Sequence, residues 1–142
     1  MGRQKVELML DKKKLKKVPF ITLQNKIIKD IIISEEKDHI IFICDNDKKY
    51  LFAHDQDCCE DVYLESIDND INLILNSPIL IAEETKHTNT KKYLKDCAEA
   101  IDTQTWSFYK LGTINGVCVF RWYGSGGGEI YSEDASLFKI KK

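Results

Sequence analysis

The chain has 142 residues, 43% of them hydrophobic, which fits a single domain with a real core. No apolar run approaches the roughly 20 residues that a transmembrane helix needs, and no apolar leader follows the N-terminus, so we expect a cytoplasmic protein without a membrane contact. The net charge of −2 is uneven: residues 1–17 hold seven basic side chains against two acidic ones, leaving 14 basic and 21 acidic residues. An acidic body disfavours a nucleic-acid polymer as the main partner.

The first half of the chain is typical of a β-meander. After the basic segment 1–19, with a short strand at 6–10, a helical turn is expected at 20–26. Strands are expected at 27–34, 39–44 and 49–54, and the turn at 45–48 is rich in residues that tolerate left-handed geometry. His39, beside a turn, is expected at the surface. A polar loop follows at 55–60 and an alternating strand at 62–67.

The second half begins with Asp68, Asn69 and Asp70, which offer a helix N-cap for a short helix at 71–75. A strand is expected at 79–85. We then expect an exposed polar excursion at 86–102, which includes His87, with a short helix at 91–100. Strands at 103–112 and 117–123 flank Ile114-Asn115-Gly116, a strong hairpin signal. The glycines at 124–128 are expected to form a mobile loop before a last strand at 131–140.

These elements predict an α+β fold, mostly antiparallel β. We expect a curved sheet or partial barrel of about seven or eight strands with one or two short helices. Residues 20–142 form its single domain.

The five cysteines are an odd count in a chain without a leader, which predicts reduced thiols. Two of them lie in the first of two clusters with functional character, His54 to Glu60. This cluster holds an imidazole, three carboxylates and two thiols, all of them metal ligands in other proteins. Adjacent thiolates rarely chelate one ion, and the acids also suit a tight turn with capped amides. A structural turn, a ligand site with His54 and Asp57, and a metal or catalytic site all remain open.

The second cluster is Arg121 to Gly128. Arginine forks onto phosphate, and glycine amides can form an anion-binding nest. Trp122 and Tyr123 point to opposite faces of a strand, so one belongs to the core and the other is free to stack on a ring. The candidate ligand-binding residues are Arg121, Trp106, Trp122, Tyr123, Gly124, Ser125, His54 and Asp57. The spacing matches neither a Walker A loop nor a dinucleotide fingerprint.

Several strings together resemble a family of small phage and prophage proteins described only as a domain of unknown function. They are residues 54–63, residues 77–84, residues 105–111, residues 121–124 and residues 131–133. The likeness spans roughly residues 20–140. The chain departs from it in its lysine-rich start and in the glycines at 126–128, where a shorter asparagine-glycine turn is expected.

The resemblance implies a viral setting and no established reaction. Small phage proteins often counter host defence, some by holding a cyclic oligonucleotide or a cyclic ADP-ribose. We therefore expect an anti-defence protein of the host cytoplasm that sequesters a nucleotide-like small molecule, with no cofactor, and homo-oligomers are compatible with this. The alternatives are a metal-dependent enzyme that degrades such a signal through the His54–Glu60 loop, and an inhibitor that masks a host protein by surface contact.

Overall fold

The computed structural model describes residues 14–54, 61–95, 98–127 and 135–141. The described strands are β1 (Leu15–Val18), β2 (Ile28–Ile33), β3 (His39–Cys44), β4 (Lys49–Ala53), β5 (Asp61–Asp68), β6 (Ile81–Lys95), β7 (Ala98–Thr113), β8 (Gly116–Gly127) and β9 (Ser136–Ile140). The described helices are single 3-10 turns, η2 (Phe20–Leu23), η3 (Asp45–Asp47) and η4 (Ile71–Ile74). None of them is long and apolar enough to cross a membrane.

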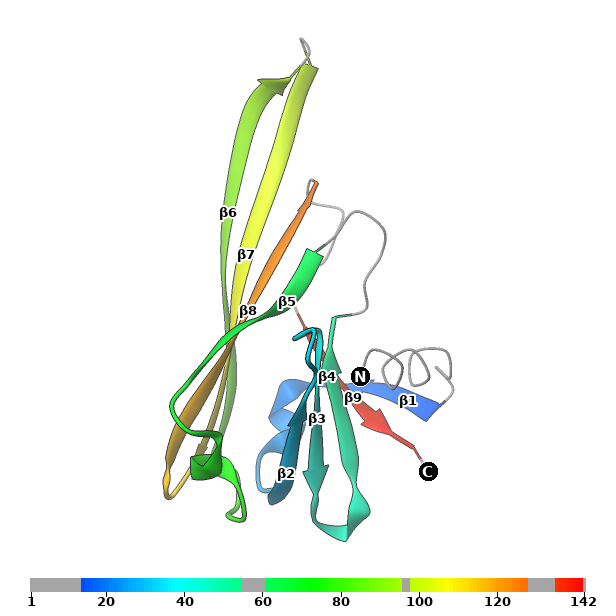
Figure 1. Cartoon of the computed structure of the whole chain (residues 1–142), viewed down its shortest axis with the longest axis vertical. Coiled ribbons are helices and arrows are strands. Elements are labelled where there is room, and N and C mark those ends of the chain that lie inside the picture. Colours follow the sequence, from blue (N-terminus) through cyan, green and yellow to red (C-terminus); the bar gives the residue numbers. More distant parts are fainter. Residues whose placement is uncertain (1–13, 55–60, 96–97, 128–134, 142) are drawn as a thin grey trace.

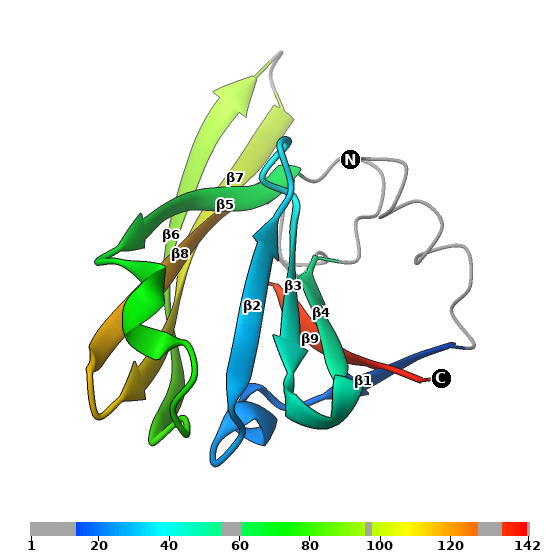
Figure 2. The same cartoon turned by 60° about the horizontal axis from the view of Figure 1, so that its bottom comes forward.

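The strands form two antiparallel sheets. One has the order β1-β9-β4-β3-β2 and the other β5-β8-β7-β6. Figures 1 and 2 show the sheets facing each other, with β6, β7 and β8 extending well past the five-stranded sheet. The mostly antiparallel prediction is confirmed. The α+β class and the single curved sheet or partial barrel are wrong for the described residues, because the strands divide between two open sheets and no α-helix is present among them. The short helical segments predicted at 20–26 and 71–75 are found as the 3-10 turns η2 and η4.

The core lies between the sheets and is dominated by aromatic rings. Phe52 of β4 packs edge-on against Tyr109 of β7 and Trp122 of β8, at centroid distances of 4.6 and 5.3 Å. Phe42 meets Phe120 edge-on at 5.9 Å. Such edge-to-face pairs are favoured by the ring quadrupoles. One cluster of buried side chains therefore joins both sheets.

Several predicted boundaries in the first half hold closely. β3 spans the predicted residues 39–44, and β2, β4 and β5 lie within one residue of prediction at each end where the chain is described. The turn after β3 has Asn46 and Asp47 at positive φ, 60° and 58°, as the composition predicts. At η4, the Asp70 side chain accepts a hydrogen bond from the Asn72 backbone amide at 2.9 Å, so the capping prediction is also right. The predicted strand at 6–10 lies outside the described residues.

The polar excursion is the largest error. Instead of a loop and a helix at 91–100, β6 and β7 continue as one long hairpin, paired from Ile81 with Gly112 to Lys95 with Ala98. The two strands are paired along this whole length, and polar side chains allow such backbone pairing as well as apolar ones. The polar composition wrongly indicated a loop, because this part of the hairpin is stabilised by backbone pairing between its two strands and not by burial in the core.

Two smaller expectations are also wrong. The predicted loop at 124–128 is a strand as far as Gly127, because β8 continues through these residues and Gly124 pairs with Val62 and Thr105. His39 is buried, not exposed, and its Nδ1 lies 2.8 Å from Asp38 Oδ1. Finally, β1 lies within the predicted N-terminal segment and pairs with β9, so this part of the segment belongs to the sheet.

Candidate functional site: the outer face of the four-stranded sheet

Four ring-bearing side chains form a row across the four-stranded sheet, one on each strand. Tyr63 of β5 pairs with Tyr123 of β8, Tyr123 with Trp106 of β7, and Trp106 with His87 of β6. Successive centroids are 5.6, 5.3 and 6.3 Å apart. We call these four residues the aromatic row. Direct cross-strand neighbours on one face come this close in any antiparallel sheet, so the register alone brings the rings together.

The aromatic row lies on the outer face of the sheet, away from the core. Alternation along β8 turns Trp122 inward, where it is fully buried, and leaves its neighbour Tyr123 half-buried on the other side. Trp106 is likewise half-buried and His87 is exposed. Figures 1 and 2 show no described strand or helix over this face. The rings therefore present part of their surface to solvent.

Arg121 lies on the same face, two residues from Tyr123. Its guanidinium carbon is 5.8 Å from the centroid of the Phe108 ring, its register partner on β7. Its Nε lies 3.1 Å from Glu65 Oε1, where a bulge between Leu64 and Ser66 inserts Glu65 into β5. The Arg121 side chain is still 43% exposed, and its Nε has no hydrogen-bond acceptor among the described residues. The contact is thus an ion pair that leaves the guanidinium accessible.

The outer face has different chemistry on the two sides of the aromatic row. On one side lie the neutral polar residues Gln104 of β7 and its register partners Asn89 and Ser125. Gln104 Nε2 donates a hydrogen bond to the Tyr123 hydroxyl at 2.9 Å. On the other side lie two cations on the central strands, Arg121 and Lys110. The face is therefore polarised along the strands.

Among the side chains that the structure describes, the carboxylates on this face belong to the two edge strands. Glu65 and Asp68 lie on β5, and Glu83 on β6 pairs with Lys110. All three are exposed. For these described side chains, positive charge thus occupies the middle of the sheet and negative charge both of its edges.

The predicted site residues separate into three groups. The outer face brings together Arg121, Trp106, Tyr123 and Ser125. Trp122 and Gly124 face the core. Because β8 is extended at Gly124, its backbone does not form the concave turn of an anion nest.

His54, the described residue of the first cluster, is not part of this face. His54 is buried at the end of β4, in the other sheet. Asp57 and the rest of the His54–Glu60 loop lie outside the described residues. Within the described part of the chain, no three metal-binding side chains gather at one point.

Sequence reasoning missed Tyr63, His87, Phe108 and Gln104 as members of this face. Alternation in the strand at 62–67 assigns Tyr63 a face, but nothing local says which strand lies beside it. His87 was assigned to an excursion that is in fact β6. The missing signal was the register, since only the pairing with Tyr123 and Trp106 puts these side chains in one row.

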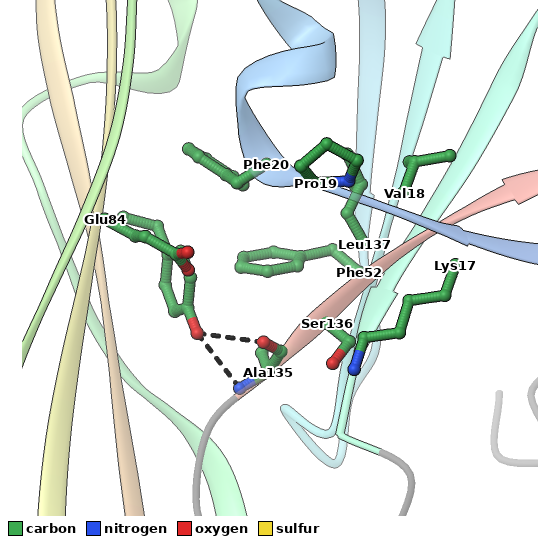
Figure 3. A pocket seen from close by; sticks show the side chains of 10 residues that line it. Lys17, Val18, Pro19, Phe20, Phe52, Glu84, Ala135, Ser136 and Leu137 are labelled. Atoms are coloured by element: carbon green, nitrogen blue, oxygen red, sulfur yellow. Dashed lines mark hydrogen bonds between the residues drawn. The ribbon is translucent and has the colours of Figure 1, made fainter.

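A hollow opens between the sheets, near the ends of β1 and β9 (Figure 3). It measures about 160 Å³ and is lined by Lys17, Val18, Pro19, Phe20, Phe52, Glu84, Tyr109, Ala135, Ser136 and Leu137. The dashed lines in Figure 3 mark its polar contacts, in which the Tyr109 hydroxyl donates to Ala135 O and accepts from Ala135 N, at 2.9 and 3.1 Å. Its Tyr109 hydroxyl is therefore already satisfied, and its Phe20 and Phe52 rings pack on each other.

Two thiols are described, and both are buried and unpaired. Burial, with a smaller contribution from Asp45, raises the pKa of Cys44 to about 11. Burial and the nearby Asp70 also raise the pKa of Cys118, whose Sγ donates to the Asp70 carbonyl at 3.0 Å. Neither thiol has the character of a nucleophile, which needs a lowered pKa. The other three cysteines lie outside the described residues.

Comparison with known proteins gives one match. The model of the family named Domain of unknown function (DUF7448) matches residues 9–137. No curated protein and no solved structure was found to match the chain.

Proposed function

Since the chain belongs to DUF7448, a family whose description assigns no activity, we propose a function from the geometry itself: the protein binds and sequesters a small nucleotide-like ligand on the outer face of its four-stranded sheet. The observation that carries the proposal is the aromatic row with Arg121 beside it. A base needs a ring to stack on and a phosphate needs a guanidinium, and Tyr123 and Arg121 offer both within two residues.

In the proposed complex the base stacks on Trp106 and Tyr123. Stacking on an aromatic ring stabilises a bound base by about 1–3 kcal/mol. The phosphate lies on the Arg121 side, and the polar edge of the base faces Gln104 and Ser125. This orientation follows from the polarity of the face, because a nucleotide also carries its charge at one end and its neutral polar groups at the other.

Sequestration is favoured over catalysis by the chemistry of this face. Its described side chains supply rings, cations, amides and, on the edge strands, carboxylates, and neither a thiol nor a group of three metal ligands. The proposed biological setting, a phage protein that withdraws an immune signal in the host cytoplasm, is supported by the resemblance of the sequence strings. Retention of the ligand without turnover is what this role requires.

The test is titration calorimetry with AMP, cyclic AMP, cyclic dinucleotides and cyclic ADP-ribose isomers, with recovery of the ligand afterwards. We expect at least one to bind and to be recovered unchanged. Binding should quench tryptophan fluorescence through Trp106, since Trp122 is fully buried. Trp106→Ala should lose both binding and quenching, and the control Ile32→Ala, at a 39% exposed position of the other sheet, should keep both. Absence of binding to every ligand, or release of cleaved products, would refute the proposal.

A further inference from the structure

Resting on the function proposed above, we infer that the ligand is a short oligonucleotide of two or three nucleotides, linear or cyclic, whose bases lie along the aromatic row. This assigns Tyr63 and His87 as binding residues. Neither is required to hold a single nucleotide on Trp106 and Tyr123.

The length of the aromatic row sets the size of the ligand. The row crosses all four strands, and neighbouring strands are about 4.8 Å apart, so it extends over roughly 14 Å. One base covers only a part of that length. Other four-stranded sheets with exposed aromatic side chains stack two or three bases on one face. The unbroken series of rings from Tyr63 to His87 provides the same capacity here.

The cations define where the phosphates lie. Lys110 pairs with Val119, which is two residues from Arg121, so Lys110 and Arg121 are diagonal neighbours on adjacent strands. Such neighbours lie about 7–8 Å apart. Two successive phosphates, or the two phosphates of a cyclic dinucleotide, can therefore each meet one cation on the same side of the aromatic row.

The carboxylates explain why the oligonucleotide is short. A long strand that followed the aromatic row would leave the sheet across β5 or β6, where its phosphates would meet Glu65 and Asp68 or Glu83. At both edges of the sheet these carboxylates repel the phosphates of the long strand, and the acidic body of the protein adds to this repulsion. A ligand whose phosphates stay over the two central strands avoids both edges.

The experiment measures affinities for one matched series: AMP, linear and cyclic di- and triadenylates, and a 20-nucleotide single strand. We expect the best di- or trinucleotide to bind at least about tenfold more tightly than AMP, as each further stacked base adds binding energy. Tyr63→Ala should remove about fivefold or more of the oligonucleotide affinity and leave AMP within about twofold, because AMP stacks elsewhere. Tyr63→Phe keeps the ring and should keep the affinity. Ile32→Ala is again the control.

Each outcome bears on the inference. Equal affinity for AMP and for every oligonucleotide, or loss of AMP binding in Tyr63→Ala, overturns the inference and leaves the proposed function standing. No binding by any member removes the proposed function as well. A 20-nucleotide strand that binds more tightly per site than the trinucleotide shows a polymer-binding surface and refutes the limit on length. The linear and cyclic arms identify which form the face prefers.

Discussion

Replacement of Arg121 by lysine separates a structural role of this side chain from a binding role. In the fold, Arg121 makes an ion pair with Glu65, and the two side chains are 43% and 34% exposed. Exposed pairs stabilise proteins by at most about 1 kcal/mol, since solvent screens them. Lysine keeps the charge, so Arg121→Lys should change the free energy of unfolding by only a few tenths of a kcal/mol.

Ligand binding should be far more sensitive to the same change. Arginine can place two parallel N–H groups on one phosphate, and lysine offers a single point charge. A hydrogen bond to a charged group contributes about 1.5–3 kcal/mol. Loss of one such bond, partly compensated by the lysine ammonium, predicts weaker binding by about 1–3 kcal/mol, or roughly 5- to 150-fold in Kd.

Glu65→Gln should act in the opposite direction. The Glu65 carboxylate competes with a phosphate for Arg121, so its neutralisation frees the guanidinium and removes a repulsive charge from the face. Because the pair is exposed, the expected gain is at most about fivefold in affinity. Glu36→Gln is the matched control: it removes the same charge at an exposed position of the β2–β3 turn, outside the four-stranded sheet.

Calorimetry and thermal unfolding of the same preparations provide the two readouts. The reasoning is refuted if Arg121→Lys binds as well as the unmodified protein. It is also refuted if Arg121→Lys loses more than about 2 kcal/mol of stability, because a loss of that size exceeds any exposed ion pair and marks a structural residue. Weaker binding in Glu65→Gln would show that this carboxylate itself contacts the ligand.

Three further predictions concern the fold. Phe52→Ala should cost about 3–5 kcal/mol of stability in chemical denaturation, because this fully buried ring joins the two sheets, and a cost below 1 kcal/mol would contradict the described core. Gly116→Ala should lower the Tm, since Gly116 has φ of 150° and an added Cβ would lie 3.0 Å from Leu73 Cδ1; an unchanged Tm would argue against this turn geometry. Cys44 and Cys118 should resist alkylation in the native protein, as peptide mapping can show. Because the raised pKa of Cys44 keeps its thiol protonated in the fold, its contribution to stability should be complete below pH 9 and decline from pH 9 to about pH 11, a decline that Cys44→Ala should lack.

Local sequence pattern was sufficient to predict strands and turns where one face of the strand is buried and the turn contains residues that favour a positive φ. The run before Asp45 has alternate residues in the core, and the turn that follows contains the Asn and Asp residues that positive φ favours. In the described part of the chain, five of the six positive-φ residues other than glycine are Asn or Asp, and Lys37 is the exception. Both the alternation of the strand and the residue types of the turn involve residues close together in the chain, so the sequence alone reveals them.

Local pattern failed where stability comes from pairing between distant segments. Residues 86–102 have too few apolar side chains to indicate a strand, yet their backbone pairs along the whole hairpin. The glycines of β8 indicate a loop by composition, yet Gly124 lies between two strands that supply its partners. The division into two sheets was unpredictable for the same reason, because strand order is a property of non-local contacts.

The candidate site shows how these two kinds of information combine. Alternation correctly assigned Trp122 and Tyr123 to opposite faces, but it could not say which one was the core residue. The partner strands decide this: Trp122 meets Phe52 of the other sheet, and Tyr123 meets Trp106 and Tyr63 of its own. A shift of one residue in the register of β8 would exchange the two faces, burying Arg121 and Tyr123 and exposing Trp122. The packing of Trp122 in the core therefore holds Tyr123 and Arg121 on the outer face, so this predicted ligand-binding residue acts on the proposed site by fixing its orientation.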